Sequence, residues 1–430
     1  MTETEKEQLE ATARNAALVR RSDLPVPLAH PARSFFGGLP NLPPEFEWPR
    51  AEVRAYKEAE TVALTFVAQI SLAELPSFEG RSPLPQTGTL YFFCSSVFEG
   101  EGSPPCRVFY YPESADSIPE RSPPPDLMPL AGSGGNYQLE WLDLTDFHSR
   151  VEFKYPISFL PFRDYVFEQN PVGGELLVKS LCDALGPGEP SGEDLLNYRR
   201  AESYAKDEDW PFNWMLIAHV ARSLLARTRY DLNPSPYRRK PISEETREAL
   251  QKIEADANHW LERSGRLPPL ENVDPDERQL FRVWWADVAL KYETMRAQVS
   301  VYPFQIPRDL GEAIDHTIRY LAAYDERALV HAPLKYVENF GRRNHWKAPT
   351  AKEGQYRFFS TAIHQILGYG SSYQAAPSEH RDDVLLLQIQ GDHAFFNWHS
   401  NSGCVLHFWI GREALSKLDF SDVEATLECD

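Results

Sequence analysis

Short apolar runs close to both ends of the chain predict β-strands. Val62–Ile70 is continuous, apolar and of strand length, and Thr89–Cys94 follows a glycine turn. Arg107–Pro112 is a further candidate strand. Near the C-terminus, Val384–Gln390 and Val405–Ile410 have the same apolar character and are bounded by charged residues and glycine. The pattern therefore predicts one group of strands early in the chain and another at its end.

The middle of the chain has the period of amphipathic helices. Residues 274–295 begin with Asp274 as the predicted N-cap, followed by Pro275 at the first helical position. The N-terminal residues 1–21 and the short segment 411–420 are also expected to be helical. Mostly apolar residues at helical spacing predict the buried faces of four central helices: Trp214, Ile217, Ala221 and Leu224; Leu250, Ile253, Ala257 and Trp260; Phe281, Trp284 or Trp285, Val288, Tyr292 and Met295; Leu310, Ile314, Thr317 and Leu321.

These patterns of apolar residues divide the chain into three regions. Residues 1–175 and 346–430 are predicted to be rich in strands, and residues 176–345 are predicted to be helical. The sequence therefore predicts an α+β fold, in which a mainly antiparallel β core is built from both chain ends and an α-helical module is inserted between them.

The two strand-rich ends resemble each other. Gln69 and Gln388 each lie near the end of an apolar strand, and in each case the next strand is aromatic. The segments Leu90–Phe93 and Leu406–Trp409 align with each other. Two readings are open: the segments are two related β units that arose by duplication, or they share the composition of any two buried hairpins.

The charge balance restricts the classes of partner. The chain has 430 residues, with 44 basic and 63 acidic side chains, which gives a formal net charge of −19. A surface of this sign repels nucleic-acid phosphates and anionic lipids, and it speeds association with a basic protein. We therefore expect no nucleic-acid or membrane partner. Two readings of the acidity are open: a basic protein is the partner class that the charge favours, or the charge serves solubility alone.

The cysteines and the N-terminus indicate a compartment. The five cysteines form no C-x-x-C pair, and their odd number is not typical of a secreted disulfide framework. We therefore expect free thiols in a reducing compartment. The first residues lack the apolar core of a signal peptide, and no run of 18 apolar residues occurs. Together these features predict a cytoplasmic protein.

No recognised catalytic or phosphate-binding motif is present, so we predict no catalytic residue and no cofactor. His393, His399 and His407, with Asp392, fall on one predicted hairpin and could bind a metal. Their spacing matches no zinc signature, and His407 alternates with apolar residues on its strand, so packing is the favoured interpretation. No metal site is predicted.

Gln69 and Gln388 are the main candidate ligand-binding residues. A buried amide needs hydrogen-bond partners or costs a few kcal/mol. In one reading, each glutamine bonds the backbone of a neighbouring loop, such as Gly37–Gly38 or Gly368–Tyr369. In the other, both point into one cleft between the two β units and bind a ligand there. The residues of that candidate site are Gln69, Gln388, Tyr369, Gln374 and His407.

Several segments with recurring Gly, Pro and aromatic residues follow one another along the chain. They are FFGGLPNLPPEFEWP from Phe35, LTFVAQISLAELP from Leu64, LPQTGTLYFF from Leu84, HQILGYGSSYQ from His364, and LLLQIQGD with GCVLHFWI near the end. In this order they resemble the YwqG-like family of bacterial proteins. The resemblance covers roughly residues 30–95 and 360–425, and the helical middle lies outside it as an insertion. It implies an α+β fold and a bacterial cytoplasmic protein of no established activity, and it assigns no catalytic residue.

Three functions are consistent with these features. The first is a non-catalytic binding protein, one version of which is an immunity-type protein that masks a basic toxin through acidic complementarity. The second is an enzyme or small-molecule sensor with a cleft between the two β units. The third is a scaffold whose helical insertion is an exposed docking surface.

Overall fold

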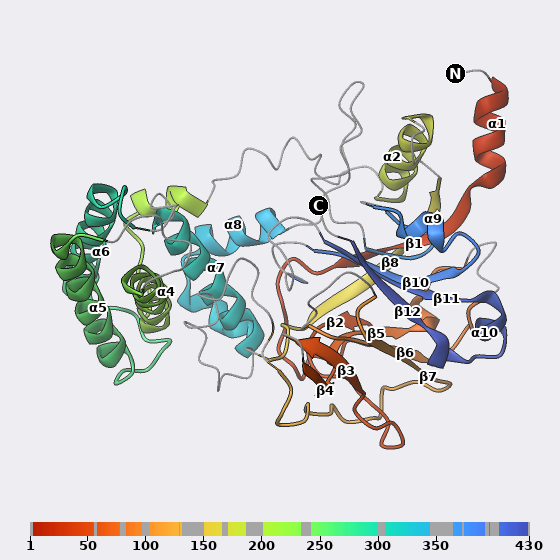
Figure 1. Cartoon of the computed structure of the whole chain (residues 1–430), viewed down its shortest axis with the longest axis horizontal. Coiled ribbons are helices and arrows are strands. Elements are labelled where there is room, and N and C mark those ends of the chain that lie inside the picture. Colours follow the sequence, from red (N-terminus) through yellow and green to blue (C-terminus); the bar gives the residue numbers. More distant parts are fainter. Residues whose placement is uncertain are drawn as a thin grey trace. The chain divides into compact units, whose positions relative to one another are not determined.

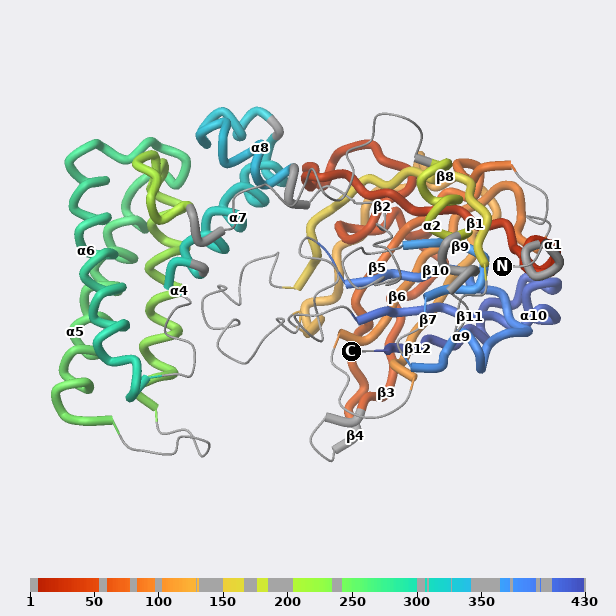
Figure 2. The backbone as a smooth tube through the Cα atoms, turned by 90° about the horizontal axis from the view of Figure 1, so that it is seen from above, coloured from red at the N-terminus to blue at the C-terminus, as the bar shows by residue number. Residues whose placement is uncertain are grey.

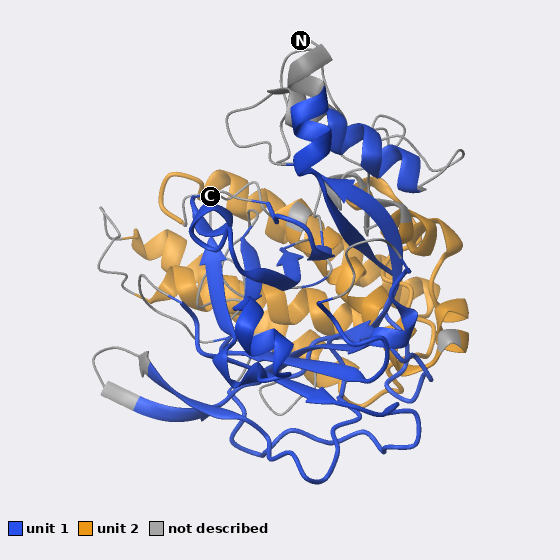
Figure 3. Ribbon diagram, turned by 90° about the vertical axis from the view of Figure 1, so that its right-hand side faces the viewer, with its two compact units in different colours: residues 1–134, 147–196, 344–430 blue, residues 135–146, 197–343 orange. Residues whose placement is uncertain are grey.

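The structure is a computed structural model. It describes residues 3–55, 58–77, 83–96, 103–128, 130, 150–165, 171–185, 201–233, 242–299, 306–344, 364–371, 374–391, 395 and 404–428. The chain divides into two compact units, shown in Figure 3. Unit 1 comprises residues 1–134, 147–196 and 344–430, and unit 2 comprises residues 135–146 and 197–343.

Unit 1 is built on one ten-stranded antiparallel sheet (Figures 1 and 2). The strands lie in the order β12-β11-β10-β9-β1-β8-β2-β5-β6-β7. Their bounds are β1 Arg14–Arg21, β2 Phe35–Phe36, β5 Thr65–Ser71, β6 Thr89–Cys94, β7 Cys106–Tyr111, β8 Tyr155–Asp164, β9 His364–Leu367, β10 Val384–Gln390, β11 Val405–Ile410 and β12 Glu424–Glu428. A separate hairpin joins β3 (Arg50–Ala55) to β4 (Glu58–Ala63). The predicted α+β fold, with an antiparallel core from both chain ends, is confirmed.

The sheet has an internal two-fold arrangement. The strands β2, β5, β6 and β7 follow one another on one side, and β9, β10, β11 and β12 follow one another on the other, with β8 and β1 paired at the centre. The β5–β6 ladder has an irregularity between Phe66 and Ala68, and the β10–β11 ladder has one between Leu385 and Leu387. Directly beyond the irregularity, the two ladders have equivalent pairs. Gln69 faces Tyr91 in one ladder, and Gln388 faces His407 in the other.

The central strands are exchanged between the two halves. Strand β1 precedes β2 in the chain but pairs with β9, while β8 precedes β9 but pairs with β2. This order is what two copies of a five-strand unit give when each contributes its first strand to the other. Of the two readings of the sequence similarity, the topology favours duplication.

The sheet curls so that its two halves meet. The rings of Phe92 on β6 and Phe408 on β11, which occupy equivalent positions, lie 5.1 Å apart. The edge strand β7 contacts the segment that leads into β12, where the Arg107 guanidinium donates to the Ser421 carbonyl oxygen at 3.2 Å. Side chains alternate between the two faces of a strand. Gln69 and Gln388 therefore point to the face opposite Phe92 and Phe408, away from the interior that the halves share.

Helices cover part of the sheet in unit 1. Helix α2 (Pro171–Leu185) packs on the central strands β1 and β8. The short helices α9 (Ala376–Glu379) and α10 (Arg412–Ser416) lie between the last strands, and the helix expected in residues 411–420 is α10. The N-terminal helix α1 ends at Thr12, and residues 14–21 form strand β1. The prediction of helix across residues 1–21 was wrong for the second half, because Ala16 to Val19 are fully buried between two neighbouring strands.

Unit 2 is helical. Its helices are α4 (Trp214–Leu232), α5 (Glu244–Ser264), α6 (Pro275–Thr294), α7 (Ile306–Tyr324) and α8 (Leu334–Asn344), with 3₁₀ turns at 201–206 and 326–331. The side chain of Asp274 caps α6, and Pro275 follows it as predicted. The predicted inward faces of α4 to α7 are all buried. In the described part of the chain, no helix is long and apolar enough to cross a membrane.

The cysteines differ from expectation. Cys94, Cys106 and Cys182 are free thiols, as predicted, but Cys404 is disulfide-bonded. Cys429 lies outside the described residues. The expectation of five free thiols was therefore wrong, because residue spacing along a chain does not show which cysteines lie side by side in the fold.

Candidate functional site

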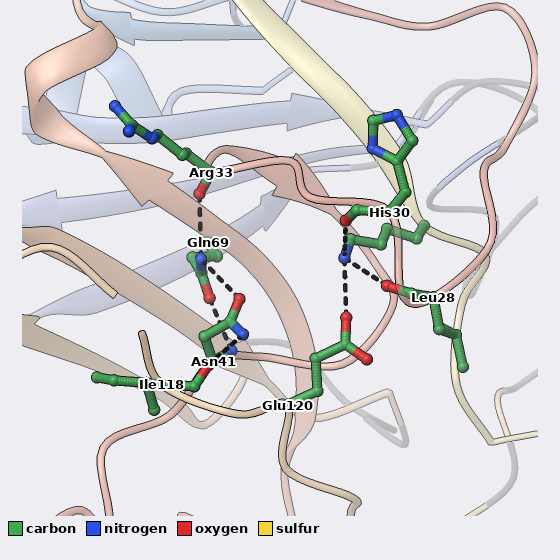
Figure 4. A network of polar contacts seen from close by, with 8 residues as sticks. Leu28, His30, Arg33, Asn41, Gln69, Ile118 and Glu120 are labelled. Carbon is green, nitrogen blue, oxygen red and sulfur yellow. Dashed lines mark hydrogen bonds and ion pairs between the residues drawn. The ribbon is translucent and has the colours of Figure 1, made fainter. Parts of the chain in front are cut away.

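The Gln69 side chain fastens the loop that follows β2 (Figure 4). Its Oε1 accepts a hydrogen bond from the Asn41 backbone N–H at 2.8 Å. Its Nε2 donates to the Arg33 carbonyl oxygen at 3.1 Å and to Asn41 Oδ1 at 3.3 Å. The Tyr91 hydroxyl, directly across the ladder, donates to the Asn41 carbonyl oxygen at 2.8 Å. Gln69 and Tyr91 together hold both backbone polar groups of Asn41.

The Gln388 side chain does the same for the loop that follows β9. Its Oε1 accepts from the Ser371 backbone N–H at 2.6 Å, and its Nε2 donates to Ser371 Oγ at 3.1 Å. His407 lies across the ladder, and its Nε2 donates to the Ser371 carbonyl oxygen at 2.9 Å. This tautomer leaves His407 Nδ1 as an acceptor, and the Thr426 hydroxyl lies 3.2 Å from it.

We call these two arrangements the N-clamp (Asn41, Gln69, Tyr91) and the C-clamp (Ser371, Gln388, His407). In each, a glutamine holds the backbone N–H and the side-chain oxygen of one loop residue, and the residue opposite the glutamine holds that residue's carbonyl. Both glutamines are at least 98% buried, so an amide that satisfies loop backbone is worth more there than at the surface.

Glycines allow each clamped loop to lie against the sheet. Gly38 has φ +68°, and a Cβ there would lie 2.9 Å from the Lys154 Cβ. Gly368 has φ +83°, and a Cβ there would clash with Asp164 Oδ2. Left-handed backbone and close packing both favour glycine at these positions.

The two halves differ in the charged group beneath the loop. In the N-terminal half, the buried Lys154 Nζ donates to the carbonyl oxygens of Leu28 at 2.6 Å and His30 at 2.8 Å, and contacts Glu120 Oε1 at 2.9 Å (Figure 4). In the C-terminal half, the buried Asp164 carboxylate accepts from the Tyr369 backbone N–H at 2.7 Å.

Asp164 is held by two further donors, one on β9 and one in the loop that follows it. It accepts from the Gln365 side-chain amide at 2.9 Å and from the Gly370 backbone N–H at 3.4 Å. Burial raises the pKa of Asp164, while these donors act in the opposite direction. The charged groups of Lys154 and Asp164 thus both form hydrogen bonds with loop backbone of this chain.

The predicted site residues fall into separate places. Gln388, His407 and Tyr369 belong to or adjoin the C-clamp, whereas Gln69 belongs to the N-clamp. Gln374 is exposed. Asp392, His393 and His399 lie outside the described residues. Within the described part, no group of three or more His, Cys, Asp or Glu side chains could hold a metal ion.

Five important residues were not identified from the sequence: Asn41, Tyr91, Ser371, Lys154 and Asp164. The alignment of Leu90–Phe93 with Leu406–Trp409 already showed that Tyr91 and His407 hold equivalent positions in the two segments. Extending it backwards to the two glycine loops would have matched Asn41 with Ser371. Lys154 and Asp164 carried no such signal, because β8 was not predicted.

The acidic excess of the chain lies in unit 1. Counted over the two units, unit 1 carries 37 acidic and 21 basic side chains, whereas unit 2 carries 26 acidic and 23 basic side chains. Carboxylates also surround half-exposed aromatic rings on the face that carries the N-clamp. Phe46 stacks on Phe109 at 4.8 Å, and partial burial together with the Glu113 and Glu45 carboxylates raises the pKa of Tyr111.

Residues 34–187 and 253–429 match the sequence pattern of DUF1963, a domain of unknown function. The chain belongs to this family. The DUF1963 match includes every residue of both clamps, together with Lys154 and Asp164. The match also includes α6, α7 and α8, which the sequence resemblance over residues 30–95 and 360–425 had left outside as an insertion. Residues 188–252, between the two matched segments, are not part of the match. A search of curated proteins finds no match to the chain.

Proposed function

We propose that this DUF1963 protein is a non-catalytic binding protein whose acidic unit 1 engages a basic protein partner. The observation that carries the proposal is the uneven charge: the excess of carboxylates belongs to unit 1, while unit 2 is close to balanced. A concentrated field of one sign speeds the encounter with a partner of opposite sign and selects against partners of like sign.

The use of the polar side chains supports the same proposal. The amide groups of Gln69 and Gln388 and the imidazole of His407 bond loop backbone, which is a structural role. An enzyme or sensor would need such groups aimed at a substrate. The alternative of a ligand cleft between the two β units therefore has less support, because both glutamines point away from the face on which the halves meet.

The acidic and aromatic surface of unit 1 has the right chemistry for lysine and arginine side chains. Exposed Glu45, Glu47 and Glu113 make no ion pair with described residues, and Tyr111 lies beside two of them. Carboxylates bind guanidinium and ammonium groups, and aromatic faces attract the same cations.

The finer proposals follow from the family resemblance. We propose that the chain is a YwqG-like bacterial protein, that it works in the cytoplasm, and that one form of its function is immunity, in which it masks a basic toxin. The Cys404 disulfide is the observation that speaks against a reducing compartment. Thiol alkylation in intact cells of the native host tests the location, since a Cys404 that alkylates without prior reduction is expected for a cytoplasmic protein.

The proposal is tested with two matched charge-reversal variants of the full chain. One changes three exposed carboxylates of unit 1 to lysine: Glu45, Glu47 and Glu113. The other changes three exposed carboxylates of unit 2 to lysine: Glu245, Glu248 and Asp276. Each is used to capture proteins from the native host at low and high salt. We expect the unit 1 variant to lose a basic protein that wild type and the unit 2 variant retain at low salt.

A further inference from the structure

Cys94 and Cys106 are direct neighbours across two antiparallel strands. Cys94 ends β6, Cys106 begins β7, and the strand ladder pairs the two residues with each other. Both are free thiols. Residues paired in this way have side chains on the same face of the sheet, so the two sulfur atoms extend to the same side.

The hydrogen bonds of the ladder fix the type of pair. The next pair along is Ser95 with Pro105, and the Ser95 backbone N–H donates to the Pro105 carbonyl oxygen at 2.9 Å. Antiparallel pairs alternate between hydrogen-bonded and non-hydrogen-bonded, so Cys94 and Cys106 form a non-hydrogen-bonded pair, in which the Cα atoms lie about 4.5 Å apart. Disulfides span Cα separations from about 4.4 Å upward, so a bridge is possible without movement of either strand.

The two thiols have different access to solvent. Cys94 is buried at 2% exposure, whereas Cys106 is half-buried on the edge strand. The Cys106 Sγ lies 3.4 Å from the Val423 carbonyl oxygen, in the segment before β12. Cys106 is therefore the thiol that a small oxidant reaches first, and Cys94 is placed to attack it afterwards.

We propose that Cys94 and Cys106 are a redox modification site that reacts with low-molecular-weight disulfides of the glutathione type. The Cys106 thiolate attacks one sulfur of the small disulfide, forms a mixed disulfide and releases one small thiol. Cys94, after loss of its proton, attacks Cys106 Sγ and releases the second small thiol. Two protein thiols are oxidised to one disulfide, and the small disulfide is reduced to two thiols.

Oxidation exchanges one contact for another at the edge of the sheet. In the reduced form the Cys106 thiol contacts the Val423 carbonyl oxygen and helps to hold β7 against the segment before β12. In the oxidised form the same sulfur is bonded to Cys94, so β7 is cross-linked to β6 and loses this contact.

The reaction is expected to be slow at neutral pH and to accelerate with pH. Burial raises the pKa of Cys106 to about 12, so the thiolate is a small fraction at pH 7 and grows about tenfold for each pH unit up to that value.

The test uses the full chain with Cys182→Ser, because Cys182 is exposed and would form its own glutathione adduct. The protein is incubated with oxidised glutathione at pH 7, 8 and 9, and its intact mass and non-reduced peptides are measured. We expect a loss of about 2 Da, the two thiol hydrogens, with a peptide that joins Cys94 to Cys106. The rate should rise about tenfold per pH unit. Adding Cys94→Ser should leave a stable glutathione adduct on Cys106.

Two results would overturn the proposal. One is that both thiols remain free after prolonged incubation at pH 9. The other is that the glutathione adduct on Cys106 persists at pH 9 although Cys94 is present, which would mean that Cys94 does not displace the glutathione. The mass measurement on the Cys182→Ser protein decides this even if the Cys94→Ser variant fails to fold.

Discussion

Replacement of Gln69 by leucine tests whether the clamps are structural. The change keeps a side chain of similar length but removes the acceptor for the Asn41 N–H and the donor for the Arg33 carbonyl oxygen. A buried polar group left without a partner costs about 1–3 kcal/mol, so two such groups cost about 2–6 kcal/mol. Burial of the more apolar leucine returns about 1–2 kcal/mol. We expect a net loss of about 1–4 kcal/mol in the free energy of unfolding.

The effect should be measured in unit 1 alone, because the two units need not unfold together. Native-state hydrogen exchange read by mass spectrometry, on peptides that contain β5 and β6, gives the local opening free energy. Gln8→Leu on α1 is the control, since Gln8 is exposed and should change stability by less than about 0.5 kcal/mol.

The outcome separates two roles for the glutamine. If Gln69 were kept for a ligand, the leucine variant would match wild type in stability and lose only ligand binding. A change of less than about 0.5 kcal/mol in the β5 and β6 peptides would therefore refute the clamp. Gln69 and Gln388 hold separate loops. The loss of unfolding free energy in a variant with both Gln69→Leu and Gln388→Leu should therefore equal the sum of the two single losses to within about 0.5 kcal/mol.

Three further substitutions test the structure by unfolding measurements. Gly368→Ala should cost about 2–4 kcal/mol because its Cβ would meet Asp164 in a left-handed backbone, whereas Gly341→Ala in α8, with open space around it, should gain up to about 1 kcal/mol; equal effects would contradict this. Lys154→Met should cost about 2–4 kcal/mol in urea unfolding, since Glu120 and two carbonyl oxygens lose their donor; a neutral effect would remove its anchoring role. Burial lowers the pKa of His407 from 6.5 to about 4, so the unfolded chain binds the proton more readily, and stability present above pH 6.5 falls by about 2 kcal/mol by pH 5. The variant His407→Gln should lose that part of the pH dependence, and an unchanged stability profile would show that His407 does not cause it.

The sequence predicted the strands whose pattern is local and missed those that tertiary contacts decide. β6, β10 and β11 coincide with the predicted runs because each is short, apolar and bounded by turns. Residues 14–21 carry three arginines and continue a helical pattern, yet they form β1 because two neighbouring strands bury its apolar residues. The buried faces of α4 to α7 and the cap of α6 were predicted correctly, since amphipathic spacing and caps are local features.

The candidate site was predicted in part for the same reason. Gln69 and Gln388 stood out because a polar residue in an apolar strand is visible in a sequence. Their partners Asn41 and Ser371 were not found, because the contact joins a strand to a loop 28 or 17 residues away. Pattern alone could not tell whether the amides faced a shared cleft, and the ladder register decided it.

Capture of proteins from the native host at low and high salt shows whether unit 1 binds a basic protein through its carboxylates. We expect one stoichiometric basic protein on wild type and on the Glu245, Glu248 and Asp276 variant at low salt. That protein should be lost at high salt, where exposed charges are screened, and lost from the Glu45, Glu47 and Glu113 variant at any salt. A partner that stays bound at high salt, or that leaves only the unit 2 variant, would show that the carboxylates of unit 1 do not hold it.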